Sequence, residues 1–176
     1  ALVARGYRII GVANSSGGIL DPDGIDPDAL HAHLAEGGAL ADAPTEGSRQ
    51  TLSGADLLTQ PCDVLIPAAL GGQIDTGNAG DIAARIVLEL ANGPVTPDAD
   101  AILEERGVIV VPDILANAGG VTVSHYEWIQ NRTGDYWSED TVIDRLTGAL
   151  EAQAGAIGAI AEDQDVPLRT AAFILA

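Results

Sequence analysis

Lysine and methionine are absent from this chain of 176 residues, and cysteine and aromatic residues are scarce. All eight basic residues are therefore arginines, against 26 acidic residues, and the net charge is −18. Proteins bind nucleic acids and anionic membranes through clusters of cations that neutralise phosphate groups. A chain this poor in cations argues against both kinds of partner.

The lone cysteine, Cys62, excludes a framework of internal disulfides and indicates a reducing compartment, so we expect a cytoplasmic protein in which Cys62 only packs. No apolar run approaches the roughly 20 residues that cross a bilayer, and no signal peptide is recognisable. His31 and His33 fall on an expected helix, where residues two apart point in different directions. They cannot share a metal ion, and we predict no metal site.

The acidic composition is typical of proteins adapted to multimolar salt, in which screening removes the repulsion between carboxylates. The absence of lysine favours this interpretation over an ordinary acidic cytosolic protein. The chain begins at Ala1 without a methionine, and residues 1–5 resemble the end of a helix. We therefore expect a fragment of a longer polypeptide.

Apolar runs alternate with helical patterns along the first three quarters of the chain. The predicted strands are 7–13, 63–66, 86–89 and 108–111. Repeated βα units of this kind predict an α/β fold with a mostly parallel sheet. The segments between the strands are predicted as helices at 29–36, 53–58, 73–84 and 96–106 and as a surface loop at 37–50. Helix caps are predicted at Asp26, Ser53, Thr96 and Ser138, because their side-chain oxygens can accept from amides in the first helical turn. After Trp137 the chain becomes helical to its end, which divides it into a domain at residues 1–137 and a helical segment at 138–176. We expect that segment to pack back on the domain or to form a hinge.

The stretch from Val108 to Trp128 organises the rest of the chain. It contains a strand that Pro112 ends, a polar loop with Asn117, paired glycines and a helix. Open α/β sheets bind ligands beyond the carboxyl ends of their strands, where Asn117 would lie. Val121 and Ser124, three residues apart, would share a helix face there. The plain alternative is a βα connection that binds no ligand.

Two other predicted strands also end in an asparagine, Asn14 and Asn92. Asn14, followed by Ser15, stands where a nucleotide-binding βαβ unit contacts the adenosine ribose. An amide there does not repel a 2′-phosphate, so NADP is admissible and NAD is not excluded, although a simple polar turn is an alternative. Ala68 and Ala69 follow a third strand, and such small residues leave room for a ligand on the backbone.

These segments resemble the cofactor-binding domain of glutamate dehydrogenase and, more broadly, of the glutamate, leucine, phenylalanine and valine dehydrogenases. The resemblance extends over nearly the whole chain and is carried by NSSGG with DPDGIDPD (14–28), DVLIPAAL (63–70), ANGPVTPDAD (91–100), VPDILANAGGVTVSHYEWIQN (111–131) and RTAAFILA (169–176). It implies a Rossmann-type, doubly wound, mostly parallel sheet, here without its first strand and glycine-rich phosphate loop, followed by C-terminal helices.

The resemblance implies the reversible oxidative deamination of glutamate to 2-oxoglutarate and ammonia with NAD or NADP, in a homohexamer. It also implies a role for each matching residue. Asn14 and Ser15 would lie near the adenosine ribose, Ala68 and Ala69 would border the cofactor, Asn92 would contact the nicotinamide ribose, Asn117 would approach nicotinamide and substrate, and Val121 and Ser124 would line the substrate's side-chain pocket.

Some features of the family are missing from these residues. Its lysines and its catalytic aspartate belong to an N-terminal domain, and a chain without lysine cannot supply them. We therefore predict no catalytic residue here and no activity for the 176 residues alone. The hydroxyl of Ser124 suits a carboxylate, which favours glutamate as substrate. The alternatives are a leucine, phenylalanine or valine dehydrogenase and a nucleotide-binding module without chemistry.

Overall fold

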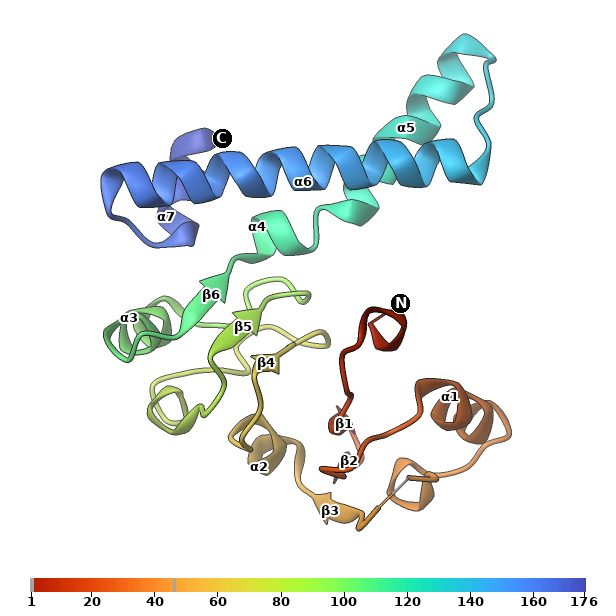
Figure 1. Ribbon diagram of the computed structural model, residues 1–176, viewed down its shortest axis with the longest axis vertical. Helices are drawn as coiled ribbons and strands as arrows, with labels where there is room; N and C mark the ends of the chain where they lie inside the picture. The colour runs from red at the N-terminus through yellow and green to blue at the C-terminus, as the bar shows by residue number, and fades with distance from the viewer. Residues whose placement is uncertain (1, 46) are drawn as a thin grey trace. The chain divides into compact units, whose positions relative to one another are not determined.

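The computed structural model describes residues 2–45 and 47–176. These residues form two compact units, which we describe separately. The first contains the chain up to residue 62 together with 81–84, and the second contains 63–80 together with 85–176. Figure 1 follows the chain from red at its N-terminus to blue at its C-terminus. Within the described residues, no helix is both long enough and apolar enough to span a membrane.

The first unit contains an antiparallel sheet in the order β1-β2-β3. Its strands are β1 (Gly11–Asn14), β2 (Gly17–Leu20) and β3 (Gln50–Leu52). Asn14 pairs with Gly17, so β1 and β2 form a hairpin with a two-residue turn. The prediction of a parallel strand at 7–13 was therefore wrong in its bounds and its direction. Polar turn residues followed by glycine reverse the chain here instead of leading into a helix.

The helices of the first unit are η1 (Val3–Arg5), α1 (Pro27–Ala35), η2 (Leu40–Asp42) and α2 (Gly54–Leu58). The predicted starts of α1 and α2 are confirmed, because Asp26 accepts a hydrogen bond from the amide of Asp28 and Ser53 accepts one from the amide of Asp56. The predicted surface loop at 37–50 instead contains η2 and contributes to the core. That core consists of Ile19, Ile25, Leu30, Leu40 and Ala43.

The second unit contains the predicted parallel sheet, in the order β4-β5-β6. Its strands are β4 (Val64–Leu65), β5 (Ile86–Leu88) and β6 (Ile109–Val111). All three lie inside the predicted ranges and run parallel, which confirms that part of the prediction. Val87 in the central strand is fully buried, as expected for a short apolar strand covered on both faces.

The predicted helix at 73–84 does not form. The segment consists of turns and a short 3₁₀ helix, η3 (Ala79–Asp81). Ile74 pairs in extended conformation with Val95, and its amide donates to the carbonyl of Pro94 at 2.9 Å. Downstream, the Asp75 carboxylate accepts from the amide of Gly77 at 2.7 Å. Side-chain bonds of this kind compete with helical hydrogen bonds, which explains the difference.

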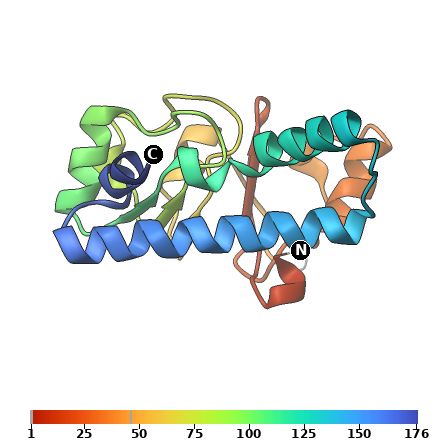
Figure 2. The same cartoon turned by 90° about the horizontal axis from the view of Figure 1, so that it is seen from above.

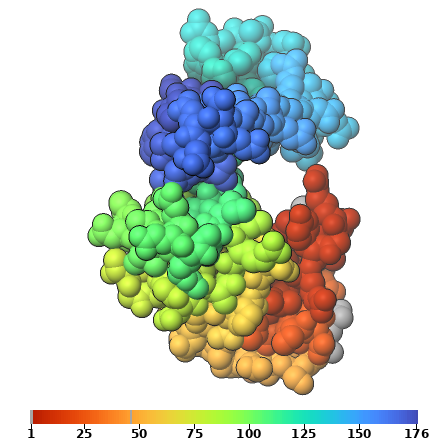
Figure 3. All heavy atoms as spheres, turned by 60° about the vertical axis from the view of Figure 1, so that its left-hand side comes forward, coloured from red at the N-terminus to blue at the C-terminus, as the bar shows by residue number. Residues whose placement is uncertain are grey.

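The remaining helices are α3 (Pro97–Glu105), α4 (Asp113–Ala116), α5 (Gly119–Thr133), α6 (Glu139–Gln164) and α7 (Leu168–Leu175). The predicted caps Thr96 and Ser138 are confirmed at the starts of α3 and α6. The loop predicted from residue 113 is in part the single helical turn α4. Figure 2 shows α5 beside one end of α6 and α7 beside the other. In Figure 3 the blue C-terminal helices lie against the green part of the same unit, as the contact between α7 and β6 requires.

Candidate functional site

The loops that follow the three parallel strands are joined by hydrogen bonds, which connect backbone groups after β4 and β5 and involve the side chains of Asp113 and Asn117 after β6. We call residues 67–72, 90–94 and 112–118 together the carboxyl edge. The amide of Ala91, after β5, donates to the carbonyl of Pro67, after β4, at 2.9 Å. The amide of Gly72 donates to the carbonyl of Gly93 at 2.8 Å. The loops after neighbouring strands therefore form one surface, at the end of the sheet where such folds bind ligands.

Two of the predicted site residues are in direct contact on this surface. The Asn117 side-chain amide nitrogen donates to the Asn92 side-chain oxygen at 2.7 Å, and more weakly to the carbonyl of Ala91 at 3.4 Å. We call Asn92 and Asn117 the asparagine pair. Asn92 is exposed and Asn117 half-buried. Among the described residues, Asn92 Nδ2 and Asn117 Oδ1 have no hydrogen-bond partner, so the pair offers one donor and one acceptor to a ligand.

Small residues keep the surface beside the asparagine pair open. Ala68 and Ala69 are both exposed in the loop that follows β4. Gly71 lies so close to the neighbouring loop that a Cβ atom there would be 3.0 Å from the carbonyl oxygen of Asn92 and 3.3 Å from that of Gly93. The close approach of these two loops therefore depends on the absence of a side chain at position 71.

The first turns of α5 present the other two predicted substrate residues. Val121 and Ser124 are three residues apart on this helix, and both are exposed, with 70% of Val121 accessible. An apolar surface and a hydroxyl group are thus available side by side. Their role in binding a substrate remains a prediction.

Asn14 and Ser15 belong to the first unit, at the turn of the β1–β2 hairpin. The Asn14 side-chain oxygen accepts hydrogen bonds from the amide of Ser16 at 2.8 Å and from its hydroxyl at 2.6 Å. Asn14 therefore stabilises a polar turn, the structural alternative raised by the sequence. Both residues are exposed, and their predicted contact with an adenosine ribose is not tested by this geometry.

Sequence reasoning missed a cluster of charged residues behind the asparagine pair, which we call the Arg169 cluster. It consists of Glu89, Asp100, Asp113 and Arg169. Glu89 is fully buried, and Arg169 donates to its Oε1 at 2.9 Å. Arg169 also donates to Asp100 at 2.6 Å. Glu89 could have indicated this cluster from the sequence, because a carboxylate at the end of a buried apolar strand needs a cationic or hydrogen-bonding partner.

The carboxylates of this cluster stabilise the protonated form of Arg169. Burial alone lowers the pKa of Arg169, but the hydrogen bonds and charges of Asp100 and Glu89 more than offset that effect, so its pKa lies above the ordinary value. The guanidinium is therefore cationic at physiological pH. Among the described residues, no group of His, Cys, Asp and Glu side chains could hold a metal ion.

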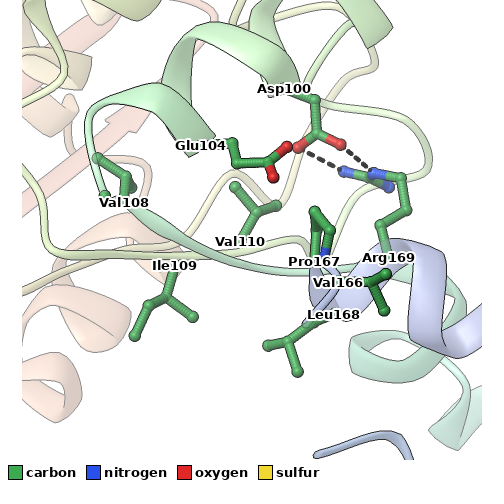
Figure 4. Close-up of a pocket in the computed structure, with 10 residues that line it drawn as sticks. Asp100, Glu104, Val108, Ile109, Val110, Val166, Pro167, Leu168 and Arg169 are labelled. Atoms are coloured by element: carbon green, nitrogen blue, oxygen red, sulfur yellow. Dashed lines mark hydrogen bonds and ion pairs between the residues drawn. The ribbon is translucent and has the colours of Figure 1, made fainter. Parts of the chain in front are cut away.

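A cavity of about 270 Å³ lies beside the Arg169 cluster (Figure 4). Asp100, Glu104 and Arg169 line it together with apolar residues 108–110 and 166–168. The predicted site residues do not line this cavity, and the carboxyl edge remains the candidate site.

The sequence of the whole chain, residues 1–176, matches the model of the glutamate/leucine/phenylalanine/valine dehydrogenase family. The chain belongs to this family. It is 47% identical over 173 residues to the NADP-specific glutamate dehydrogenase A1 of Halobacterium salinarum, covering 98% of this chain and 41% of that protein. It is 44% identical over 170 residues to an NAD-specific glutamate dehydrogenase of Staphylococcus aureus, covering 97% and 40%. The chain thus spans about two-fifths of the length of these dehydrogenases.

The fold agrees with that of a solved member of the family. The hetero-hexameric glutamate dehydrogenase of Thermus thermophilus, in a leucine-bound form, superposes with a TM-score of 0.85 at 32% identity. That match covers 97% of this chain and 39% of the dehydrogenase chain. It confirms the predicted α/β fold of a dehydrogenase cofactor domain.

Proposed function

We propose that this chain is the cofactor-binding part of a glutamate dehydrogenase. The enzyme converts L-glutamate reversibly to 2-oxoglutarate and ammonia, with NAD or NADP as the second substrate. The observation that carries the proposal is the contact of Asn92 with Asn117 at the carboxyl edge. Relatives named as NAD-specific and NADP-specific glutamate dehydrogenases support the choice of substrate and leave both cofactors possible.

The residues at the carboxyl edge fit the nicotinamide half of a dinucleotide. Asn92 Nδ2 is available to donate a hydrogen bond to a ribose hydroxyl oxygen, and the exposed Ala68 and Ala69 leave space for a flat ring over the backbone. When bound, the dinucleotide supplies the acceptor for the hydride that leaves the α-carbon of glutamate. The role of Asn14 and Ser15 at the adenosine ribose belongs to the same proposal.

The chain's own residues bind and orient the reactants in this proposal. Asn117, held by Asn92, uses its remaining oxygen to fix the nicotinamide and the substrate amine side by side. Val121 contacts the methylene groups of glutamate, and the Ser124 hydroxyl donates to its side-chain carboxylate. Proton transfer falls to lysine and aspartate groups outside these residues, since the chain contains no lysine.

Ser124 also bears on the alternative substrates. Leucine, phenylalanine and valine offer nothing to a hydroxyl in the side-chain pocket, which would then be desolvated without a partner. We further propose a cytoplasmic, salt-adapted enzyme that assembles as a homohexamer; the solved Thermus relative is also hexameric, although it is a hetero-hexamer. Residues 138–176 form a segment that packs back on the cofactor domain through α7 and β6 in this account.

The proposal is tested on the full-length polypeptide that carries this chain, in multimolar salt. Initial rates are measured with glutamate, leucine, phenylalanine and valine, each with NAD and with NADP. We expect turnover of glutamate, and an Asn92→Ala variant with a kcat/KM for the dinucleotide reduced about 10-fold or more. Gln153→Ala, which removes an exposed amide side chain from α6, is the matched control and should stay near the parent value. A preference for leucine, phenylalanine or valine would reject glutamate as the substrate. Absence of turnover with all four amino acids would favour a nucleotide-binding module without chemistry.

A further inference from the structure

Arg169 on α7 is connected to both members of the asparagine pair through a continuous series of contacts. Arg169 Nη2 donates to Glu89 Oε1 at 2.9 Å, and the other Glu89 oxygen accepts from the backbone amide of Asp113 at 2.8 Å. The Asp113 carboxylate then accepts from the amide of Gly93 at 2.7 Å. Gly93 is the residue directly after Asn92, so the series ends at the backbone that carries that side chain.

Asp113 also determines where Asn117 lies. It is the first residue of α4, and its carbonyl accepts from the amide of Asn117, which ends that helical turn, at 3.0 Å. Its carboxylate holds the Asn92 loop, while its backbone holds the Asn117 turn. A shift of Asp113 would therefore move the two asparagines relative to each other.

We propose that Arg169 is a positioning residue for the nicotinamide end of the cofactor site. It acts through Glu89 and Asp113 and does not touch cofactor or substrate. The proposal rests on the function proposed above and goes beyond it, because it couples the C-terminal helix to the geometry of the asparagine pair. By linkage, ligand binding at the pair and the docking of Arg169 stabilise each other.

The burial of Glu89 explains why the cation is required. A fully buried carboxylate that loses its cationic partner is strongly destabilised, and its neighbourhood rearranges to reach water or another donor. The amide of Asp113 donates to this same carboxylate, so a rearrangement of Glu89 is transmitted to Asp113 directly.

Lysine is a poor substitute for this cation. One planar guanidinium reaches three carboxylates through different nitrogens: Nε to Asp100 at 2.6 Å, Nη2 to Glu89 at 2.9 Å and Nη1 to Asp113 at 3.7 Å. An ammonium group lacks this fixed fork of donors. Figure 4 shows the guanidinium facing the Asp100 carboxylate, with dashed lines marking the interactions between them.

The attachment of α7 to the rest of the unit does not depend on Arg169 alone. Ala171 and Ala172 are buried on α7 and pack with Ile157 of α6. This apolar contact would hold the helix in place when the guanidinium is removed. The positioning role of Arg169 can therefore be separated experimentally from the anchoring of α7.

The test is a double-mutant cycle in the full-length polypeptide in multimolar salt. The variants are Arg169→Gln, Asn92→Ala and their combination, with Arg106→Ala as control. Arg106 lies in the same unit and donates a long-range hydrogen bond to the carbonyl of Ala79 at 2.7 Å. Among the described residues, it forms no ion pair with a carboxylate of the Arg169 cluster. For each protein, kcat and KM with glutamate and the Kd of NADH and NADPH by fluorescence are measured well below the melting temperature.

We expect Arg169→Gln to reduce kcat/KM on the order of 10- to 100-fold in the parent, since small displacements of reacting groups have effects of this size. In the Asn92→Ala background the same change should cause a smaller loss than in the parent, because the part transmitted to Asn92 is already removed and coupled residues are not additive. Arg106→Ala should remain near the parent value. Arg169→Lys, which keeps the charge and loses the fork, should give an intermediate loss.

Equal losses with and without Asn92, or no loss from Arg169→Gln, would overturn the proposal. If Arg169→Gln does not fold, as judged by circular dichroism, Arg169→Lys takes its place in the cycle with the same criterion. Failure of the proposed function is distinguishable, because the parent itself would then neither oxidise glutamate nor bind either dinucleotide. If the parent binds a dinucleotide without oxidising glutamate, the cycle is judged on Kd alone.

Discussion

Gly71→Ala should disturb the candidate site through one added methyl group. The new Cβ atom would lie 3.0 Å from the carbonyl oxygen of Asn92 and 3.3 Å from that of Gly93. Both contacts are with backbone atoms, which cannot rotate away as a flexible side chain can. The loop that carries Asn92 must therefore shift by a few tenths of an ångström or more. Overpacking of this kind costs about 1–3 kcal/mol in the free energy of unfolding.

The displaced side chain is the one proposed to hold the nicotinamide ribose. We therefore expect Gly71→Ala to lower kcat/KM for the dinucleotide about 10-fold or more in the full-length enzyme, at a temperature where it remains folded. Steady-state kinetics and thermal unfolding are measured on the same samples. Gly80→Ala is the matched control, since a Cβ at position 80 meets no atom within 4 Å. Equal values of kcat/KM for the dinucleotide in Gly71→Ala and Gly80→Ala would refute the reasoning.

Three further predictions concern the substrate, the core and pH. Ser124→Ala should raise KM for glutamate about 10-fold, because a hydrogen bond to a charged group is worth roughly 1.5–3 kcal/mol, and should leave KM for the dinucleotide unchanged; equal rises in both would argue against a side-chain contact. Leu103→Ala, at a fully buried position, should lower the free energy of unfolding in urea by about 2–5 kcal/mol, while Ile143→Ala, half exposed, should lower it much less; similar losses would contradict the described core. Burial raises the pKa of Asp21, but hydrogen bonds from the backbone amides of Gly47 and Asp23 lower it by more, so the folded pKa is depressed. The ionised Asp21 carboxylate therefore stabilises the folded protein at a pH above its unfolded-state pKa of about 3.9. This stabilisation is lost as the pH falls through the folded-state pKa of Asp21. Asp21→Asn should have a lower free energy of unfolding than the parent at pH 7, and the difference between the two proteins should become smaller below about pH 4. A difference that does not change with pH would contradict this prediction.

Local patterns were sufficient to predict much of the second unit. The short apolar runs at 86–89 and 108–111 became β5 and β6, because a buried parallel strand needs little more than consecutive β-branched residues between breakers. Thr96 and Ser138 were correctly predicted as helix caps, since the capping bond joins residues three apart. The positions of Asn92 and Asn117 followed from the rule that parallel strands end at the same edge.

The failures involve interactions between residues distant in sequence. The segment 73–84 has helical spacing, but Ile74 pairs with Val95 and is drawn into an extended conformation. The strand predicted at 7–13 turns back in a hairpin instead of joining the parallel sheet. Glu89 and Arg169 are 80 residues apart, and their ion pair depends on how α7 docks. No local pattern carries that information.

The most direct test of the central claim compares two ligands of the full-length polypeptide by calorimetry. The dinucleotide carries both the adenosine and the nicotinamide halves, whereas ADP carries only the first. If the asparagine pair holds the nicotinamide half, Asn92→Ala should weaken binding of the dinucleotide about 10-fold and leave the Kd of ADP unchanged. Equal weakening of both ligands, or of neither, would contradict the account.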